Sequence, residues 1–200
     1  MLAVRRLAPR LLICSLFASL LAACGVNDIP TYDEAVKAGW AQVDNQYKRR
    51  ADLIPNLVEV VKGFAAQEQE TLTAVVEARA KATQMQIPSD ILSNPDAFRQ
   101  FEANQGAITQ ALSRLLLVVE RYPDLKSNQN FLSLQAQLEG TENRIAVARR
   151  DYIQAVQTYN TELRTFPGRI WAVLLYSDMT LRETFSQPES LAAPPQVNFN

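Results

Sequence analysis

The feature that most constrains this chain is a long helical repeat of apolar side chains in its C-terminal half. Between residues 131 and 166, apolar, aromatic or small side chains recur at spacings of three and four residues; they are Phe131, Leu134, Leu138, Thr141, Ile145, Ala148, Tyr152, Ala155, Tyr159, Leu163 and Phe166. This spacing places them on one face of an α-helix, which is stable when another helix covers it. We expect the helix to begin after a cap at Asp124 or Ser127 and to end at Phe166-Pro167-Gly168, because proline and glycine stop it there.

Two further stretches carry the same period. One is expected to begin at Pro95, with Asn94 as its N-cap, and to end at Tyr122, before the next proline. Its buried face is predicted to hold Phe98, Phe101, Gln105, Ile108, Leu112, Leu115, Val119 and Tyr122. The other begins near Thr31 and Glu34, which fit a capping box in which the threonine is the N-cap.

Pro55 interrupts this other stretch. Because proline has no backbone N–H, it breaks a hydrogen bond in a helix interior but is tolerated in a first turn. Asp52 is placed to cap such a new first turn. We therefore expect two helices, about 33–49 and 53–86, that are kinked or split near Asp52–Pro55.

These repeats predict an all-α fold, an elongated antiparallel helical bundle with up-down, coiled-coil-like packing. Connections of about four to ten residues are typical of such packing. Residues 169–176 are expected to form a short helix or an extended segment that caps the bundle, the alternative being an adhesive surface for a partner or the bilayer. The predicted organisation is a tether at 24–32, a bundle at 33–176 and a partly disordered tail at 177–200.

Residues 1–23 resemble a lipoprotein signal peptide. A basic stretch with three arginines precedes an apolar run, and Leu21-Ala22-Ala23-Cys24 is a lipobox. The run from residue 11 to residue 23 is about 20 Å long as a helix, shorter than the ~30 Å hydrocarbon core of a bilayer. We expect cleavage before Cys24 and acylation of its thiol, the alternative being a retained signal anchor.

Processing at this site predicts a location. Cleavage removes three arginines and no acidic residue, so the net charge moves from −1 to −4 over the remaining 177 residues. Cys24 is then the only cysteine left in the chain, which excludes a disulfide within it. Gly25, rather than an aspartate, follows Cys24, which favours the outer membrane where the host has one. We expect a protein of the cell envelope that faces the periplasm and contacts the membrane through lipidated Cys24.

Composition excludes several kinds of chemistry. The chain has no histidine, and histidine is the commonest metal ligand and general base at neutral pH. A mildly acidic chain lacks the basic footprint of a nucleic-acid binder. The sequence also lacks a Gly-rich phosphate loop, a nucleophile elbow and a metal-ligating Cys/Asp pattern. We expect no catalytic residue, no metal, no cofactor and no nucleic-acid partner.

Several motifs resemble those of the LemA family. They are Arg49-Arg50-Ala51-Asp52-Leu53-Ile54-Pro55-Asn56-Leu57-Val58, Val61-Lys62-Gly63-Phe64, Tyr122-Pro123-Asp124-Leu125-Lys126, Thr141-Glu142-Asn143-Arg144-Ile145, Tyr159-Asn160 and Phe166-Pro167, in the family's order. The resemblance implies a membrane-anchored protein built as a long antiparallel helical bundle, with no accepted catalytic residues to carry over. Gln67-Glu68 stands where a His-Glu pair is common in the family, and Tyr152-Ile153 stands where Tyr-Asn is common. A proton or metal role for that histidine is therefore not transferred to this chain.

Polar residues gather around the proline in the first motif, and two interpretations are open. Arg49, Arg50, Asp52 and Asn56 could grip an anionic ligand such as a phosphate or a carboxylate. Alternatively, Asp52 caps a helix, Arg50 pairs within the bundle, and Asn56 satisfies the backbone that Pro55 frees. The second interpretation is favoured, because polar residues at a helix break usually serve the backbone.

Two more charged side chains, Glu68 and Arg79, fall at or near the predicted buried faces. An ion pair between helices is a commoner role for such residues than catalysis. Candidate partners are Arg114, Arg144, Glu139 and Glu142.

The function best supported by the sequence is that of a non-enzymatic scaffold or adaptor that binds envelope proteins through its helical faces. The alternative is an enzyme or a small-ligand binder that uses Arg49, Arg50, Asp52 and Glu68, and it predicts one cavity lined by these residues. A spacer without a dedicated partner is the third interpretation.

Overall fold

A computed structural model describes residues 25–186 of the chain. Within that range all regular structure is helical: α2 (Asp28–Phe64), α3 (Gln69–Gln84), α4 (Pro95–Val119), α5 (Pro123–Lys126), α6 (Gln129–Arg164), α7 (Gly168–Leu174) and a short 3₁₀ turn, η1 (Ile91–Ser93). The predicted all-α class is therefore confirmed. The signal peptide, Cys24 and residues 187–200 lie outside the described residues.

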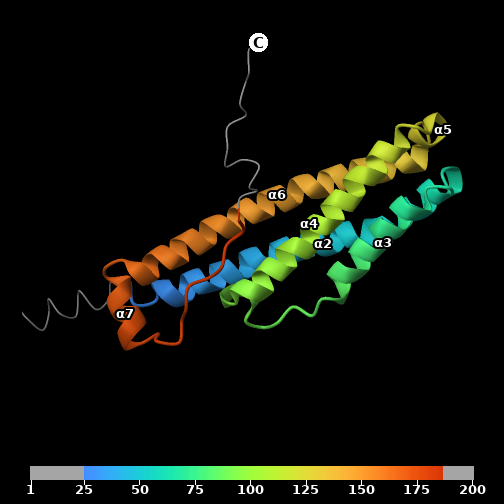
Figure 1. Ribbon diagram of the computed structural model, residues 1–200. Helices are drawn as coiled ribbons and strands as arrows, with labels where there is room; N and C mark the ends of the chain where they lie inside the picture. The colour runs from blue at the N-terminus through green and yellow to red at the C-terminus, as the bar shows by residue number, and fades with distance from the viewer. Residues whose placement is uncertain (1–24, 187–200) are drawn as a thin grey trace, which may run out of the picture.

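Helices α2 and α6 form the long axis of the bundle (Figure 1). They are antiparallel: Gly39 lies against Tyr152, whereas Arg50, further along α2, contacts Glu142, which comes earlier in α6. Helices α3 and α4 lie beside this pair, and α5 and α7 lie at opposite ends of the molecule (Figure 1). The elongated antiparallel bundle predicted from the apolar period is thus present.

Gly39 sets the distance between α2 and α6. A Cβ atom built on this glycine would lie 3.3 Å from the Cα of Tyr152. This is tighter than an ordinary van der Waals contact, and the neighbouring atom is backbone that cannot rotate away. The absence of a side chain therefore allows the two backbones to approach at this crossing.

The expected start of the first helix is wrong. Helix α2 begins at Asp28 after Asn27, and the Thr31 hydroxyl donates to the Asn27 carbonyl at 2.7 Å instead of capping the helix. Pro30 is compatible with this earlier start, because the first N–H groups of a helix have no partner within the helix. Residues 28–32, which we expected in the tether, therefore belong to α2.

The expected division into two helices at Asp52–Pro55 is also wrong, because α2 continues through Pro55 as one helix. Proline at this position leaves the carbonyl of Ala51, four residues earlier, without its helical donor. Arg79 from α3 replaces it, since its Nε donates to the Ala51 oxygen at 2.8 Å. Asp52 and Asn56 are exposed and do not serve this carbonyl. The break falls instead between Phe64, where α2 ends, and Gln69, where α3 begins.

The contact of Arg79 with Ala51 makes a prediction about stability. Replacing Arg79 with methionine should lower the free energy of unfolding by about 1–2 kcal/mol, because a carbonyl loses a charged donor. In a Pro55→Ala background the new amide can bond to Ala51, so the cost of Arg79→Met should fall by about 1 kcal/mol. Urea unfolding of the four chains measures this coupling, with the exposed Lys81→Met as a control on the same helix. Equal costs in both backgrounds would contradict this role for Arg79.

The core has two parts along the bundle. Towards the α5 end it is mainly aliphatic, and its buried members include Leu57, Val61, Leu72, Leu115 and Phe131. Towards the α7 end it is aromatic, with Trp40, Phe98, Phe101, Tyr152 and Phe185 in contact. None of the helices within residues 25–186 is both long and apolar enough to cross a membrane.

The segment after α7, residues 177–186, lies against the bundle. The Tyr152 hydroxyl donates to the Glu183 carbonyl at 2.7 Å, and the Glu183 amide donates to the Leu92 carbonyl at 2.7 Å. Asn160 and Arg182 exchange two hydrogen bonds of 2.9 Å through the Asn160 side chain and the Arg182 backbone. The sequence placed residues 177–186 in the tail, and the structure places them in the bundle.

Candidate functional site

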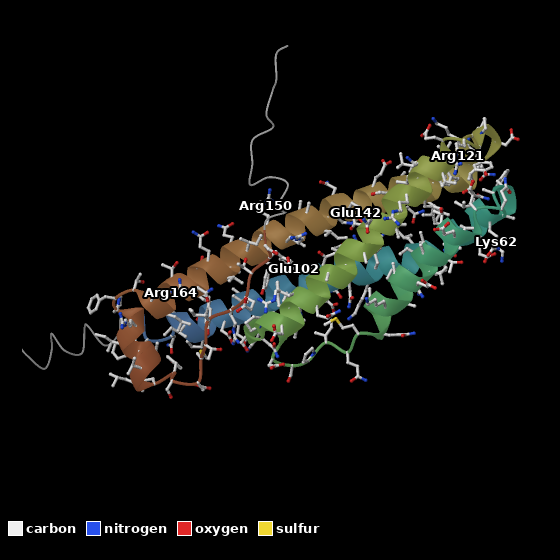
Figure 2. All side chains as sticks on the ribbon, viewed as in Figure 1. Lys62, Glu102, Arg121, Glu142, Arg150 and Arg164 are labelled. Carbon is white, nitrogen blue, oxygen red and sulfur yellow. The ribbon has the colours of Figure 1, made fainter. Side chains whose placement is uncertain are left out.

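The polar centre of the bundle is Arg50, whose side chain comes from α2 and is 1% exposed. One terminal nitrogen donates to Oε1 of Glu142 and to Oγ1 of Thr109, both at 3.0 Å. The other donates to the side-chain and backbone oxygens of Gln105, at 2.7 and 3.1 Å. We call Arg50, Gln105, Thr109 and Glu142 the Arg50 cluster; it joins α2, α4 and α6, and Figure 2 shows Glu142 near the crossing of α4 and α6.

A pocket of about 260 Å³ opens beside the Arg50 cluster. The Arg149 guanidinium lies 4.3 Å from the centre of the Phe185 ring and 3.9 Å from a carboxylate oxygen of Glu102. Tyr47 also lines the pocket, and burial raises the pKa of its hydroxyl. The pocket therefore offers two cations and two carboxylates, with little net charge.

The other residues of the predicted cluster do not join Arg50. Arg49, Asp52 and Asn56 are exposed on α2, and Glu68 lies in the connection between α2 and α3. Of these predicted residues only Arg50 lines the pocket. The single cavity required by the ligand-binding interpretation is therefore not formed, whereas the expected internal pairing of Arg50 is observed.

Glu68 takes part in a separate polar contact at the α5 end of the bundle. Its carboxylate accepts from the Tyr122 hydroxyl at 2.7 Å and from Arg121 at 3.0 Å. The hydrogen bond to Glu68 raises the pKa of Tyr122, and Gln67 donates to the same hydroxyl at 3.0 Å. An ion pair for Glu68 was expected, but Arg121 was not among the candidate partners. The position of Arg121 directly before the Tyr122-Pro123 motif was the feature of the sequence that could have indicated this partner.

A third polar contact was not anticipated from the sequence. Arg182 holds Oδ1 of the buried Asp33 with two nitrogens, at 2.6 and 2.9 Å, and Lys37 lies 3.0 Å from Oδ2. Asn160, which belongs to the Tyr159-Asn160 motif, fixes the backbone of Arg182. The pairing spans most of the chain, so no local pattern indicates it. Among residues 25–186 no three His, Cys, Asp or Glu side chains are grouped to hold a metal ion.

Comparison with known proteins gives a consistent result. A family model described as "LemA family" matches residues 39–199. "Magnetosome protein MamQ 2" of Paramagnetospirillum magneticum is 25% identical over 187 residues, which cover 86% of this chain and 68% of that protein. "Magnetosome protein MamQ" of Magnetospirillum gryphiswaldense is 25% identical over 164 residues, covering 74% of this chain and 60% of that protein. "Protein LemA" of Metamycoplasma hominis is 24% identical over 119 residues, covering 60% of this chain and 50% of that protein.

Proposed function

The chain belongs to the LemA family, and from this premise we propose that it is a lipid-anchored scaffold of the cell envelope that binds partner proteins along its helical faces. The relatives' names assign no enzymatic activity, and two of them name a magnetosome protein.

The observation that carries the proposal is the use of polar motif residues inside the bundle. Arg50 joins three helices, Glu68 joins the α2–α3 connection to Arg121, and Asn160 fixes the C-terminal segment. These residues maintain the architecture, so no catalytic role is needed to explain why they occur in the motifs. A long surface that partners could bind is the outer side of α6, which is exposed from residue 143 to residue 161.

The dimensions of the bundle suit a scaffold. Helix α2 has 37 residues, which corresponds to about 55 Å at 1.5 Å per residue. The described chain begins at the α7 end, next to Cys24 in the sequence (Figure 1). An anchor at Cys24 would therefore hold one end of the bundle at the membrane and leave the α5 end free to reach a partner.

The anchor makes a prediction of its own. Cys24→Ala should abolish the labelling of the protein by radioactive palmitate and leave the unprocessed precursor, because the lipobox loses its acylated thiol. Cys14→Ala is the matched control, since this cysteine lies within the signal peptide and should not affect labelling of the mature chain. Unchanged labelling of Cys24→Ala would contradict a lipid anchor.

The scaffold role is tested by capture of partners. Envelopes that contain the tagged full-length chain are crosslinked and solubilised, and the chain is then purified. The proposal predicts one or a few proteins that are enriched over a capture with an unrelated envelope lipoprotein. Recovery of no specific protein would contradict the proposal and favour a spacer.

The pocket beside the Arg50 cluster supports a second candidate function, the binding of a small anion. Nε of Arg50 is buried and has no hydrogen-bond partner within the described residues, and Arg149 lines the same pocket. Inorganic phosphate or acetate should then raise the unfolding temperature, and Arg149→Gln should remove the effect while the exposed Arg150→Gln preserves it. No shift in the unmodified chain would exclude these anions as ligands.

A further inference from the structure

The end of the bundle formed by α7 carries a cluster of exposed apolar side chains, which we call the α7 patch. It consists of Phe166, Ile170, Val173, Leu174 and Leu175, whose exposed fractions are 80, 45, 71, 68 and 58%. Within α7, residues 170, 173 and 174 follow the helical spacing of three and four, so they lie on one side of the helix. They line a shallow hollow together with Arg164 and Arg169. Phe166 precedes α7 but borders the same hollow as these three residues. Exposed apolar clusters of this kind are typical of surfaces that contact a membrane or another molecule.

The path of the chain places this patch beside the expected lipid attachment site. A Cβ atom built on Gly25 would lie 3.7 Å from Cγ of Pro167, the residue that precedes α7. Cys24 is joined to Gly25 by one peptide bond, so their Cα atoms are about 3.8 Å apart. Acyl chains attached to Cys24 would therefore enter the bilayer close to the start of α7.

The charges around the patch suit a lipid surface. Arg164 and Arg169 flank the apolar side chains, and Figure 2 shows Arg164 at the α7 end of the bundle. Apolar side chains bordered by basic ones are typical of segments that lie in the plane of the membrane interface, where the apolar face enters the acyl boundary and the cations meet anionic headgroups. Helix α7 has seven residues and cannot span a bilayer, so contact at the surface is the mode that its length allows.

We propose that the α7 patch inserts into the bilayer surface, so that the bundle is held at the membrane by a second contact beside Cys24. This proposal rests on the proposed membrane anchor and adds an orientation to it. With two adjacent contacts the bundle no longer pivots freely about one lipidated residue, and α7 lies in the membrane interface.

The test places a photoreactive benzophenone amino acid at Val173 or at Leu117 in the full-length chain. Leu117 is the matched control: it is 72% exposed, against 71% for Val173, and it lies in the last turn of α4 near the opposite end of the bundle. Envelopes that contain isotopically labelled fatty acids are irradiated, and the chain is purified and digested with trypsin. Adducts are scored on the peptide from residue 170 to residue 182 or from residue 115 to residue 121, neither of which contains Cys24.

The proposal predicts lipid adducts on the peptide that carries residue 173, several-fold more abundant than on the peptide that carries residue 117. Equal lipid labelling of both positions would overturn it. Adducts of residue 173 with a protein or with a second copy of this chain, in place of lipid, would overturn it as well. Palmitate on Cys24 without lipid adducts at residue 173 refutes the α7 contact alone, whereas lipid adducts at residue 173 without palmitate refute the lipid anchor alone.

Discussion

Replacing Arg50 with methionine is expected to lower the free energy of unfolding by about 3 kcal/mol, since breaking a buried ion pair leaves uncompensated polar groups. Methionine fills much of the volume but donates no hydrogen bond. The side-chain and backbone oxygens of Gln105 and the hydroxyl of Thr109 would then each lose the hydrogen bond that Arg50 donates. Glu142 has 40% of its side chain exposed and can turn to water, so the loss should remain below that of a fully buried pair.

Arg49→Met provides the matched control for this experiment. Arg49 precedes Arg50 in the same motif and carries the same charge, but its side chain is exposed. Its replacement should change stability by no more than about 0.5 kcal/mol. Urea unfolding followed by circular dichroism measures both variants. Similar losses for the two would show that the charge, rather than the buried contacts of Arg50, stabilises the bundle.

The second large effect is expected at Tyr152, which is fully buried in the aromatic part of the core. Its ring lies 5.7 Å from that of Trp40 and 5.5 Å from that of Phe185, measured between ring centres. Tyr152→Ala should cost about 3–5 kcal/mol, because the cavity removes contacts with α2, α4 and the C-terminal segment. Tyr152→Phe keeps the ring and should cost about 1 kcal/mol, the value of the hydrogen bond to the Glu183 carbonyl. Equal losses of unfolding free energy for Tyr152→Ala and Tyr152→Phe would contradict the larger contribution assigned to the ring than to the hydroxyl.

The same residue predicts a dependence on pH. Burial raises the pKa of Tyr152 above its usual value of 10. The neutral hydroxyl therefore contributes its full stability below pH 10, and the contribution is lost as the pH rises above that value, because the unfolded chain ionises first. The stability difference between the unmodified chain and Tyr152→Phe should narrow above pH 10. A constant difference from pH 8 to pH 11 would contradict this expectation.

Much of the fold was predictable because the apolar period is a local property of the sequence. It identified the long helices, and Asn94 and Pro95 marked the start of α4 correctly, since the Asn94 side chain accepts from the Ala97 amide. The behaviour of α2 at Pro55 was not predictable in the same way. The donor that completes this helix is Arg79, 28 residues further along the chain, and a window on α2 cannot contain it.

The polar contacts show the same limit. The pairing of Arg50 within the bundle was expected from its position on the buried face, because a charge there requires a partner. Its partner Glu142 lies 92 residues away. From the sequence, Glu142 was a candidate ion-pair partner for Arg79, not for Arg50. The Asp33–Arg182 pair depends on the path of residues 177–186, which follow a helix-ending turn and carry no apolar period of their own. Contacts between residues so far apart in the sequence are determined by the whole fold.

Site-resolved photocrosslinking along α6 tests the scaffold account most directly. A benzophenone amino acid is placed in turn at each exposed position from Asn143 to Thr161, and the envelopes are irradiated and analysed for protein adducts. A docked partner predicts the same adduct at positions three or four residues apart, with the intervening positions unlabelled, because one face of the helix is covered. No protein adduct at any of these positions, or weak adducts of equal strength at all of them, would contradict a scaffold that binds through this face.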